Sequence, residues 1–484
     1  MRSVIILLFL LFSSLFAGNS YFKIRGIVEG FYGPYYTHEQ RREFIKFIGE
    51  LGFNCYIYAP KSDPKHRKRW REGYSAEEME EFEETIKLCR QLGIHFVIAL
   101  SPGLNPGKGD IRTALLEKFL DFGSKGCKDF AIFYDDIKLK NPGRDAAEQK
   151  RTVNYLLSKL KENYSGCNLF FCPTVYAGVY GKKRAKARAY LHGLRGMDSR
   201  VISFWTGDNG SAFSPKITRH AAAQMKRILG CHIAIWDNYP VNDNARNYTY
   251  FGAYSGREKY LYRTVSGVFL NPMLDPNLSR FPVYTASLYF DNPLSYSSSD
   301  AYIKALEHFS EVEARKTFRL FADGLQYNRY VFINRKNNPE LKELIENFVE
   351  TPSSQKAVVL KEYFDLMEQA PEVFKSGIKD RLLYEGMIPL IKKTRNIGIA
   401  ARIACNIIVK EGGGNDLEPE KARLQELLNA ITAEKKVIYK DVFEPLWEAA
   451  SISPSSDYVN DTSKTYKIDK DSPIPDPIEH LSED

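Results

Sequence analysis

The chain has 484 residues, of which 68 are lysine or arginine and 60 are aspartate or glutamate, so its formal net charge is +8. This modest excess comes without a nucleic-acid-binding module, so we expect no nucleic-acid partner. The eight histidines and seven cysteines show no His-x-x-x-His or Cys-x-x-Cys spacing, which argues against a structural metal site.

The first 20 residues have the pattern of a secretory signal peptide. Arg2 precedes an apolar run over residues 4–12, and small residues lead to a possible cleavage site after Ala17. We therefore expect a secreted or periplasmic protein, with an uncleaved membrane anchor as the alternative. No other run is long enough to span a bilayer, so no further membrane insertion is expected. The cysteines lie mostly in core-like strands and helix faces, which favours buried thiols over a disulfide framework.

Eight short apolar runs, most of them separated by helical patterns, each end in polar or aromatic residues. They are Phe22–Gly33, Asn54–Pro60, His95–Gly103, Phe130–Ile137, Asn168–Tyr176, Val201–Gly207, His232–Pro240 and Gly267–Pro272. Eight strands alternating with helices in this length predict a (β/α)8 TIM barrel over residues 21–300. A doubly wound open sheet is the competing fold, but no glycine-rich phosphate fingerprint follows the first strand.

Two of the intervals between runs open with a capping box. Thr37 is followed by Gln40, and Ser75 by Glu78, each three residues later. Apolar residues then recur at helical spacing, and Gly52 and Gly93 follow as helix stops. These local signals predict where the first two barrel helices begin and end.

The fourth run ends in two adjacent carboxylates, Asp135 and Asp136. Burying a charged aspartate is costly without a partner, although one of the pair could cap the next helix and the other could be solvated. In a TIM barrel, functional residues gather where strands end. The other strand ends supply carboxylates, amides and aromatic rings: Glu29, Gly30, Phe31, Tyr32, Gly33, Lys61, Asp63, His66, Tyr176, Trp205, Trp236, Asp237, Asn238, Asn242, Asp243 and Asn271. Such a mouth suits a sugar, because amides and acids bond hydroxyls and rings cover the C–H face.

Seven motifs occur in an order that resembles glycoside hydrolase family 84, the β-N-acetylglucosaminidases that include the protein O-GlcNAcases. They are Gly-Ile-Val-Glu-Gly-Phe-Tyr-Gly at 26–33, Tyr-Ala-Pro-Lys at 58–61, Ser-Pro-Gly-Leu at 101–104, Tyr-Asp-Asp-Ile at 134–137, Cys-Pro-Thr-Val-Tyr at 172–176, Ile-Trp-Asp-Asn-Tyr at 235–239 and Leu-Asn-Pro at 270–272. The resemblance covers residues 26–272, which is nearly the whole predicted barrel.

The resemblance implies a retaining exo-β-N-acetylglucosaminidase that uses the 2-acetamido group of its substrate as nucleophile, with no metal or cofactor. Asp135 is then the residue that orients the acetamide, and Asp136 the general acid and base. Two close carboxylates are also expected to push each other's pKa values apart. By the same resemblance, substrate contacts come from Gly30, Lys61, Tyr176, Trp236, Asn238, Asp243 and Asn271. The expected partner is a glycoprotein or glycan that carries GlcNAc.

Six of these residues could instead have an ordinary structural role. Lys61 and Asp243 could be solvated loop residues, Tyr176 and Trp236 rim packing, and the two asparagines chain turns after strands. The basic run at residues 66–71 is typical of a solvated face. Two other functions also remain open at this point: endo-cleavage of a polymer such as hyaluronan, and a catalytically silent glycan-binding barrel.

Beyond residue 300 only helical patterns occur, and they predict an α-helical bundle over residues 301–450. One long helical pattern runs from Val373 to Val409 and is interrupted by Pro389. We find no catalytic constellation in this region, so a stabilising role or a wall beside the site is expected. From Ser451 to the end, proline, serine and aspartate dominate without an apolar period, which indicates a disordered tail over 451–484.

Overall fold

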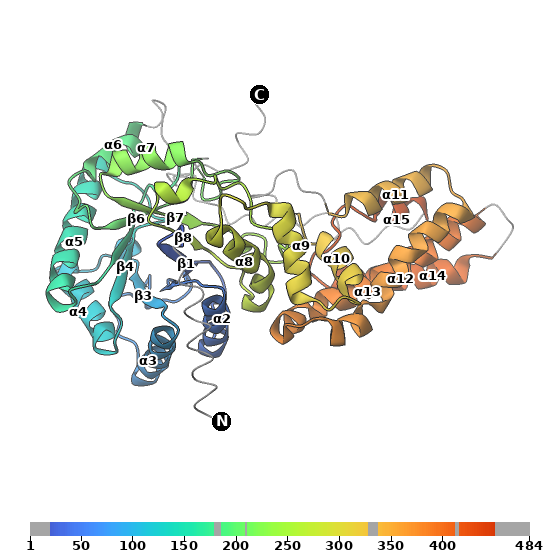
Figure 1. Ribbon diagram of the computed structural model, residues 1–484, viewed down its shortest axis with the longest axis horizontal. Helices are drawn as coiled ribbons and strands as arrows, with labels where there is room; N and C mark the ends of the chain where they lie inside the picture. Colours follow the sequence, from blue (N-terminus) through green and yellow to red (C-terminus); the bar gives the residue numbers. More distant parts are fainter. Residues whose placement is uncertain (1–19, 179–184, 209–210, 328–336, 412–415, 451–484) are drawn as a thin grey trace.

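The structure is a computed structural model that describes residues 20–178, 185–208, 211–327, 337–411 and 416–450. The predicted signal peptide, except for Ser20, and the predicted tail over 451–484 lie outside these residues. A rounded barrel and an elongated helical region beside it make up the molecule (Figure 1). Within the described ranges, no helix combines the length and apolar character needed to cross a membrane.

Eight parallel strands close into a barrel in chain order, with β8 hydrogen-bonded to β1. The strands are β1 (Ile24–Glu29), β2 (Cys55–Tyr58), β3 (His95–Leu100), β4 (Asp129–Phe133), β5 (Leu169–Cys172), β6 (Ile202–Trp205), β7 (His232–Asp237) and β8 (Gly267–Leu270). Their side chains alternate between the barrel interior and the layer of helices, so they are buried on both faces. The closed barrel confirms the predicted (β/α)8 fold and excludes the open sheet.

Helices follow the strands and cover the outside of the barrel (Figure 1). They are α2 (His38–Glu50), α3 (Ala76–Gln91), α4 (Ile111–Ser124), α5 (Pro142–Asn163), α6 (Ala185–Gly193), α7 (Arg219–Leu229) and α8 (Pro276–Asp291). Both predicted capping boxes form, at Thr37 and at Ser75. Gly52 and Gly93 adopt positive φ angles of 75° and 69° after the helices end, as a helix stop requires.

The helical region contains α9 (Ser298–Phe309), α10 (Arg315–Asp323), α11 (Pro339–Glu350), α12 (Ser354–Gly377), α13 (Arg381–Lys410), α14 (Glu418–Ala433) and α15 (Glu444–Ala449). It joins the barrel through α8 and α13, where Arg280 donates to Asp380 at 2.8 Å. Phe374 of α12 packs edge-on against Phe318 and Phe321 of α10. The core therefore continues from the barrel into this region.

The predicted continuous pattern from Val373 to Val409 was wrong in one respect. The chain breaks between α12 and α13, where Ile378 pairs with Ser310 and the Asp380 side chain caps the next helix at the N–H of Leu383. Pro389, the expected interruption, lies inside α13 instead. The boundary between α12 and α13 is set by a tertiary pairing and a side-chain cap, and neither of them changes the apolar periodicity.

Candidate functional site

Asp135 and Asp136 follow β4 and face different surroundings. Asp135 is buried, whereas Asp136 is exposed. Asp136 also has a φ angle of 54°, in the left-handed region that non-glycine residues seldom adopt. This conformation turns the chain sharply after the strand, so the two adjacent carboxylates meet different partners.

Asp135 is paired with Lys61, which comes from the loop after β2. The Lys61 ammonium donates to Oδ2 of Asp135, and both side chains are almost fully buried. The other oxygen, Oδ1, is buried and has no hydrogen-bond partner within the described part of the protein. A buried carboxylate oxygen without a partner is costly, so this atom is poised to accept a hydrogen bond from a ligand.

Asp136 is held by two tyrosine hydroxyls. Tyr32 donates to Oδ2 at 2.8 Å, and Tyr176 donates to Oδ1 at 2.7 Å. Burial, and then the negative charge of Asp136, raise the pKa of both phenols, so both remain protonated donors. Arg67 completes the cluster by donating to the Tyr32 hydroxyl at 2.6 Å and to the backbone carbonyl of Asp136 at 3.3 Å.

A chain of amides links the ends of β7, β8 and β1. Trp236 donates from Nε1 to Oδ1 of Asn238 at 3.0 Å, and Asn271 donates from Nδ2 to the same oxygen at 2.9 Å. Asn271 in turn accepts the N–H of Gly30 at 3.3 Å, while Asn238 donates to the carbonyl of Ala212 at 2.8 Å. The predicted amide residues therefore lie together and orient one another.

Gly30 is required by the packing of Trp236. A Cβ atom at position 30 would lie 2.3 Å from Cζ2 of the Trp236 ring. That ring is itself fixed between Phe133 and Phe204, with centroid distances of 5.2 and 5.6 Å. The Lys61 ammonium lies 5.3 Å from the centroid of the same indole. Gly30, Lys61 and Trp236 thus form one packed unit beside Asp135.

Asp243 lies on the loop after β7 and accepts the backbone N–H of Tyr32 at 2.9 Å. Burial raises the pKa of its carboxyl group; the Tyr32 N–H opposes that rise and the charge of Asp136 adds to it. Asp243 is therefore connected to Asp136 through Tyr32. All nine residues predicted for the site lie at the carboxyl-terminal end of the barrel, linked by these contacts.

Several other residues expected at the mouth serve the scaffold instead. Glu29 is fully buried and accepts from the Arg41 guanidinium at 2.7 and 3.0 Å and from the Tyr56 hydroxyl. Asp237 is likewise paired with Arg257 and accepts from the Tyr254 hydroxyl at 2.6 Å. These carboxylates have the local setting of site residues in the sequence, but their charges are already neutralised within the barrel wall.

Arg67, which the sequence offered only as part of a basic run, belongs to the site. Its loop is held by Lys118 of α4, whose ammonium donates to the carbonyls of Lys65, Trp70 and Glu72. Tyr32 was noted at a strand end without a role, and the structure places it against Asp136. Of Arg67 and Tyr32, only Tyr32 had a sequence signal for a role in the site, because it lies inside the first motif.

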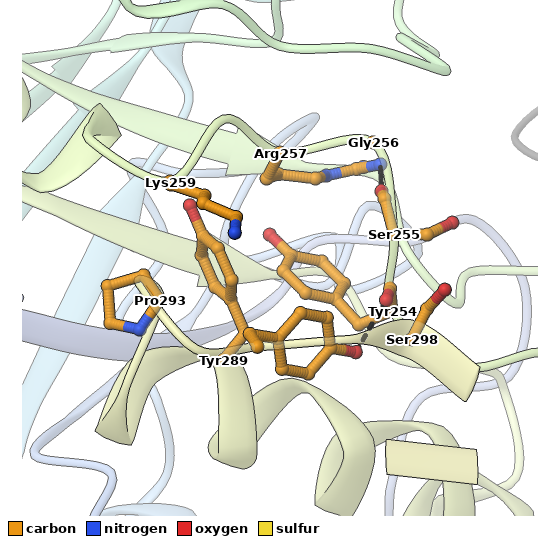
Figure 2. Close-up of a pocket in the computed structure, with 9 residues that line it drawn as sticks. Tyr254, Ser255, Gly256, Arg257, Lys259, Tyr289, Pro293 and Ser298 are labelled. Atoms are coloured by element: carbon orange, nitrogen blue, oxygen red, sulfur yellow. Dashed lines mark hydrogen bonds between the residues drawn. The ribbon is translucent and has the colours of Figure 1, made fainter. Parts of the chain in front are cut away.

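A separate cavity of about 190 Å³ opens beside the end of α8 (Figure 2). Tyr254, Tyr289 and Tyr296 line it together with Arg257 and Lys259, and none of the nine site residues does. The Arg257 guanidinium in its wall is engaged by Asp237 and by the carbonyl of Ser255. The cavity is therefore distinct from the carboxylate pair.

A TIM barrel with two carboxylates at one strand end, surrounded by amides and aromatic rings, has the organisation of a glycoside hydrolase. The family model for β-N-acetylglucosaminidase matches residues 25–323, which is more than half of the chain. The chain therefore belongs to this family, glycoside hydrolase family 84, as its motifs indicated.

Curated relatives agree with this assignment. The chain is 30% identical to the protein O-GlcNAcases of Mus musculus and Rattus norvegicus over 292 residues. That match covers 58% of this chain and 31% of either relative, so the chain spans about a third of their length.

Solved structures extend the likeness into the helical region. CpGH84B is 27% identical with a TM-score of 0.76, and the match covers 89% of this chain and 77% of that one. A mutant of the O-GlcNAc hydrolase of Thermobaculum terrenum is 25% identical with a TM-score of 0.77, covering 89% of this chain and 94% of the other. The match therefore includes the barrel and most of the helices beyond it.

Proposed function

We propose that this protein is a retaining exo-β-N-acetylglucosaminidase that removes O-linked GlcNAc from glycoproteins by substrate-assisted catalysis. The observation that carries the proposal is Oδ1 of Asp135, a buried acceptor that no described residue donates to, beside the exposed carboxylate of Asp136. An acetamide N–H is a donor that such an oxygen needs. The names of the relatives, protein O-GlcNAcase and O-GlcNAc hydrolase, support the choice of sugar.

In the first step, Asp135 accepts the acetamide N–H and thereby increases the nucleophilicity of the acetamide carbonyl oxygen. This oxygen attacks the anomeric carbon as the bond from that carbon to the leaving oxygen breaks. Protonated Asp136 gives its proton to the leaving oxygen, and a bicyclic oxazoline forms as the acetamide N–H proton passes to Asp135. Lys61 holds Asp135 in place through its other oxygen.

In the second step, Asp136 accepts a proton from a water molecule whose oxygen attacks the anomeric carbon. The oxazoline C–O bond breaks, and the acetamide is regenerated as Asp135 returns the proton to its nitrogen. The hydrogen bonds from Tyr32 and Tyr176 to the two oxygens of Asp136 suit the carboxylate that this step needs. Two displacements at the same carbon give retention of configuration.

The remaining predicted residues fit recognition of the sugar. Asn271 and Asp243 are proposed to bond its hydroxyl groups, together with Lys61, and the Gly30 carbonyl adds a backbone acceptor. Trp236 and Tyr176 are proposed as walls around the acetamide, with Asn238 orienting the indole through its Nε1–H. Because these side chains already hold one another, little ordering is required when the sugar binds.

The test compares 4-nitrophenyl β-GlcNAc with the corresponding β-glucoside, which lacks the acetamide nucleophile. We expect rapid hydrolysis of the first and almost none of the second, no effect of EDTA, and the β-anomer as the first product by NMR. Brisk hydrolysis of the glucoside, or release of the α-anomer first, would contradict the mechanism. Cleavage of hyaluronan in preference to the single-sugar substrate would favour the endo-acting alternative, and absence of turnover would favour a silent binding barrel.

We also propose that the protein is exported, since residues 1–20 have the composition of a signal peptide. N-terminal sequencing of the protein recovered from outside the cytoplasm tests this directly. A mature N-terminus close to Gly18 is expected, and an intact N-terminus in a membrane fraction would indicate an uncleaved anchor instead.

A further inference from the structure

We propose that the mouth of the barrel carries a cationic rim, formed by Lys68, Arg71, Lys108 and Lys140, which selects acidic polypeptide around the sugar-bearing residue. This inference rests on the proposed function and specifies its substrate class. The rim lies on three loops, after β2, β3 and β4, and none of its residues belongs to the catalytic machinery described above.

The loops after β2 and β3 form one surface. Trp70 donates from Nε1 to the carbonyl of Asn105 at 2.7 Å, and the Asn105 amide donates back to the carbonyl of Lys68 at 3.3 Å. The Arg71 guanidinium donates to the carbonyl of Pro106 at 2.7 Å. These contacts hold Lys68 and Arg71 close to Lys108.

The third loop adjoins the same surface and includes Asp136. Arg67 bridges from the loop after β2 to the backbone carbonyl of Asp136. A Cβ atom at Gly103 would lie 2.7 Å from Cδ1 of Ile137, so the loop after β3 runs beside the residue that follows Asp136. The rim therefore stands on the side of the general acid, where the leaving group departs.

Most of the charge of the rim is uncompensated, although the Asp145 carboxylate accepts the backbone N–H of Lys140 at 2.9 Å. Lys68, Lys108 and Lys140 are exposed, and none of them forms an ion pair with a described residue. Glu72 is the one acidic residue within segments 67–72, 103–109 and 137–140, and it pairs with Arg69 at 3.1 Å. Arg71 stacks on Trp70, with its Cζ 4.6 Å from the ring centroid, and forms no ion pair with a described residue.

The opposite side of the mouth has no such excess. The described segments after β6, β7 and β8 are 206–208, 211–218, 238–247 and 271–275, and they contain two basic residues, Lys216 and Arg246, against Asp208, Asp243 and Asp275. A polyanionic polysaccharide crossing the whole mouth would meet both sides. A peptide that enters the site only through its sugar would meet the cationic side alone, which favours an acidic peptide as the occupant.

The test uses three GlcNAc-serine peptides that differ only in flanking glutamate, glutamine or lysine. At low salt the glutamate peptide is expected to have a kcat/KM about tenfold above that of the glutamine peptide, as two or three partly screened charge pairs would produce. The advantage should largely disappear near 1 M salt, where the Debye length is only about 3 Å. Hydrolysis of 4-nitrophenyl β-GlcNAc reports the basal activity in parallel.

The decisive variant is Lys68→Gln/Lys108→Gln/Lys140→Gln, with Arg71 retained because it also joins the loops. It should lose the preference for glutamate and keep the basal activity within about twofold, which is no more than the effect of one typical surface charge pair. The matched control, Lys304→Gln/Lys316→Gln/Lys375→Gln, removes the same charge from exposed lysines of α9, α10 and α12 and should keep the preference.

Equal rates for the three peptides, or a preference that survives in the rim variant, would overturn the proposal. So would a rim variant that loses hydrolysis of hyaluronan rather than of acidic peptide, since the occupant would then be a polysaccharide. Failure of the proposed function has a different signature, because the wild-type protein would then leave 4-nitrophenyl β-GlcNAc intact.

Discussion

A single methyl group at position 30 is expected to disable the site while leaving the barrel folded. The new Cβ of Gly30→Ala would lie 2.3 Å from Cζ2 of Trp236, and ordinary contact begins at 3.4 Å, so the indole must retreat by about 1.1 Å. Phe133, Phe204 and Asn238 fix that ring, so the shift passes on to its neighbours. Overpacking of this kind typically costs about 1–3 kcal/mol of stability.

The effect on turnover should exceed the effect on folding. Misplacement by about 1 Å can reduce a rate about 10²-fold, and Lys61, which holds Asp135, lies over the displaced ring. We therefore expect kcat/KM for 4-nitrophenyl β-GlcNAc to fall about 10²-fold, with a small decrease in melting temperature measured by differential scanning fluorimetry.

Two variants make the comparison specific. Gly26→Ala places a Cβ 2.1 Å from the Phe269 ring, inside β1, the strand that Gly30 follows, so it should destabilise the barrel with a smaller loss of activity. In a Trp236→Phe background, which removes the clashing atoms, Gly30→Ala should cost much less than it does in the wild type. Wild-type activity in Gly30→Ala, or equal losses in both backgrounds, would refute the reasoning.

Three further outcomes are expected. Asp136→Asn should impair substrates with poor leaving groups most, by about 10²–10⁴-fold, and equal losses across aryl glycosides of very different leaving-group pKa would contradict its role as acid. Arg67→Met should lower kcat at least about tenfold with little change in KM, because Arg67 positions Tyr32 and the Asp136 backbone, and Arg67→Lys should recover part of the loss, whereas a KM effect alone would contradict this role. Burial, and then the charge of Lys61, lower the pKa of His66 to about 3. As the pH falls, the unfolded chain therefore takes up a proton on His66 before the folded protein does. The contribution of neutral His66 to the free energy of unfolding is present in full above about pH 6.5. It decreases by about 1.4 kcal/mol per pH unit as the pH falls toward 3. His66→Asn can keep the bond to the Ala99 carbonyl, so the variant should lose less stability than the wild type between these pH values in acid-unfolding experiments, and parallel curves would contradict the shift.

Much of the fold was predictable because its signals are local. Both capping boxes and both helix-stop glycines act within a few residues of one another, and each strand is an apolar run bounded by polar residues. The order of such runs leaves few alternatives to a barrel. The seven buried thiols also agree with the expectation from their positions in strands and helix faces. The split between α12 and α13 escaped prediction because Ser310, far along the chain, pairs with Ile378.

The sequence by itself determined the barrel and the family, and it placed two adjacent carboxylates at the end of a strand, because periodicity, caps and motif order are properties of neighbouring residues. Only the tertiary structure decided which charged residues serve the site. Glu29 and Asp237 stand at strand ends just as Asp135 does, yet arginines 12 and 20 residues away engage both of their carboxylate oxygens. Arg67 reads as one cation in a solvated run, yet it reaches the backbone of Asp136, 69 residues further along the chain. Closing the barrel creates these contacts, and no local pattern encodes which distant partner a charge will meet.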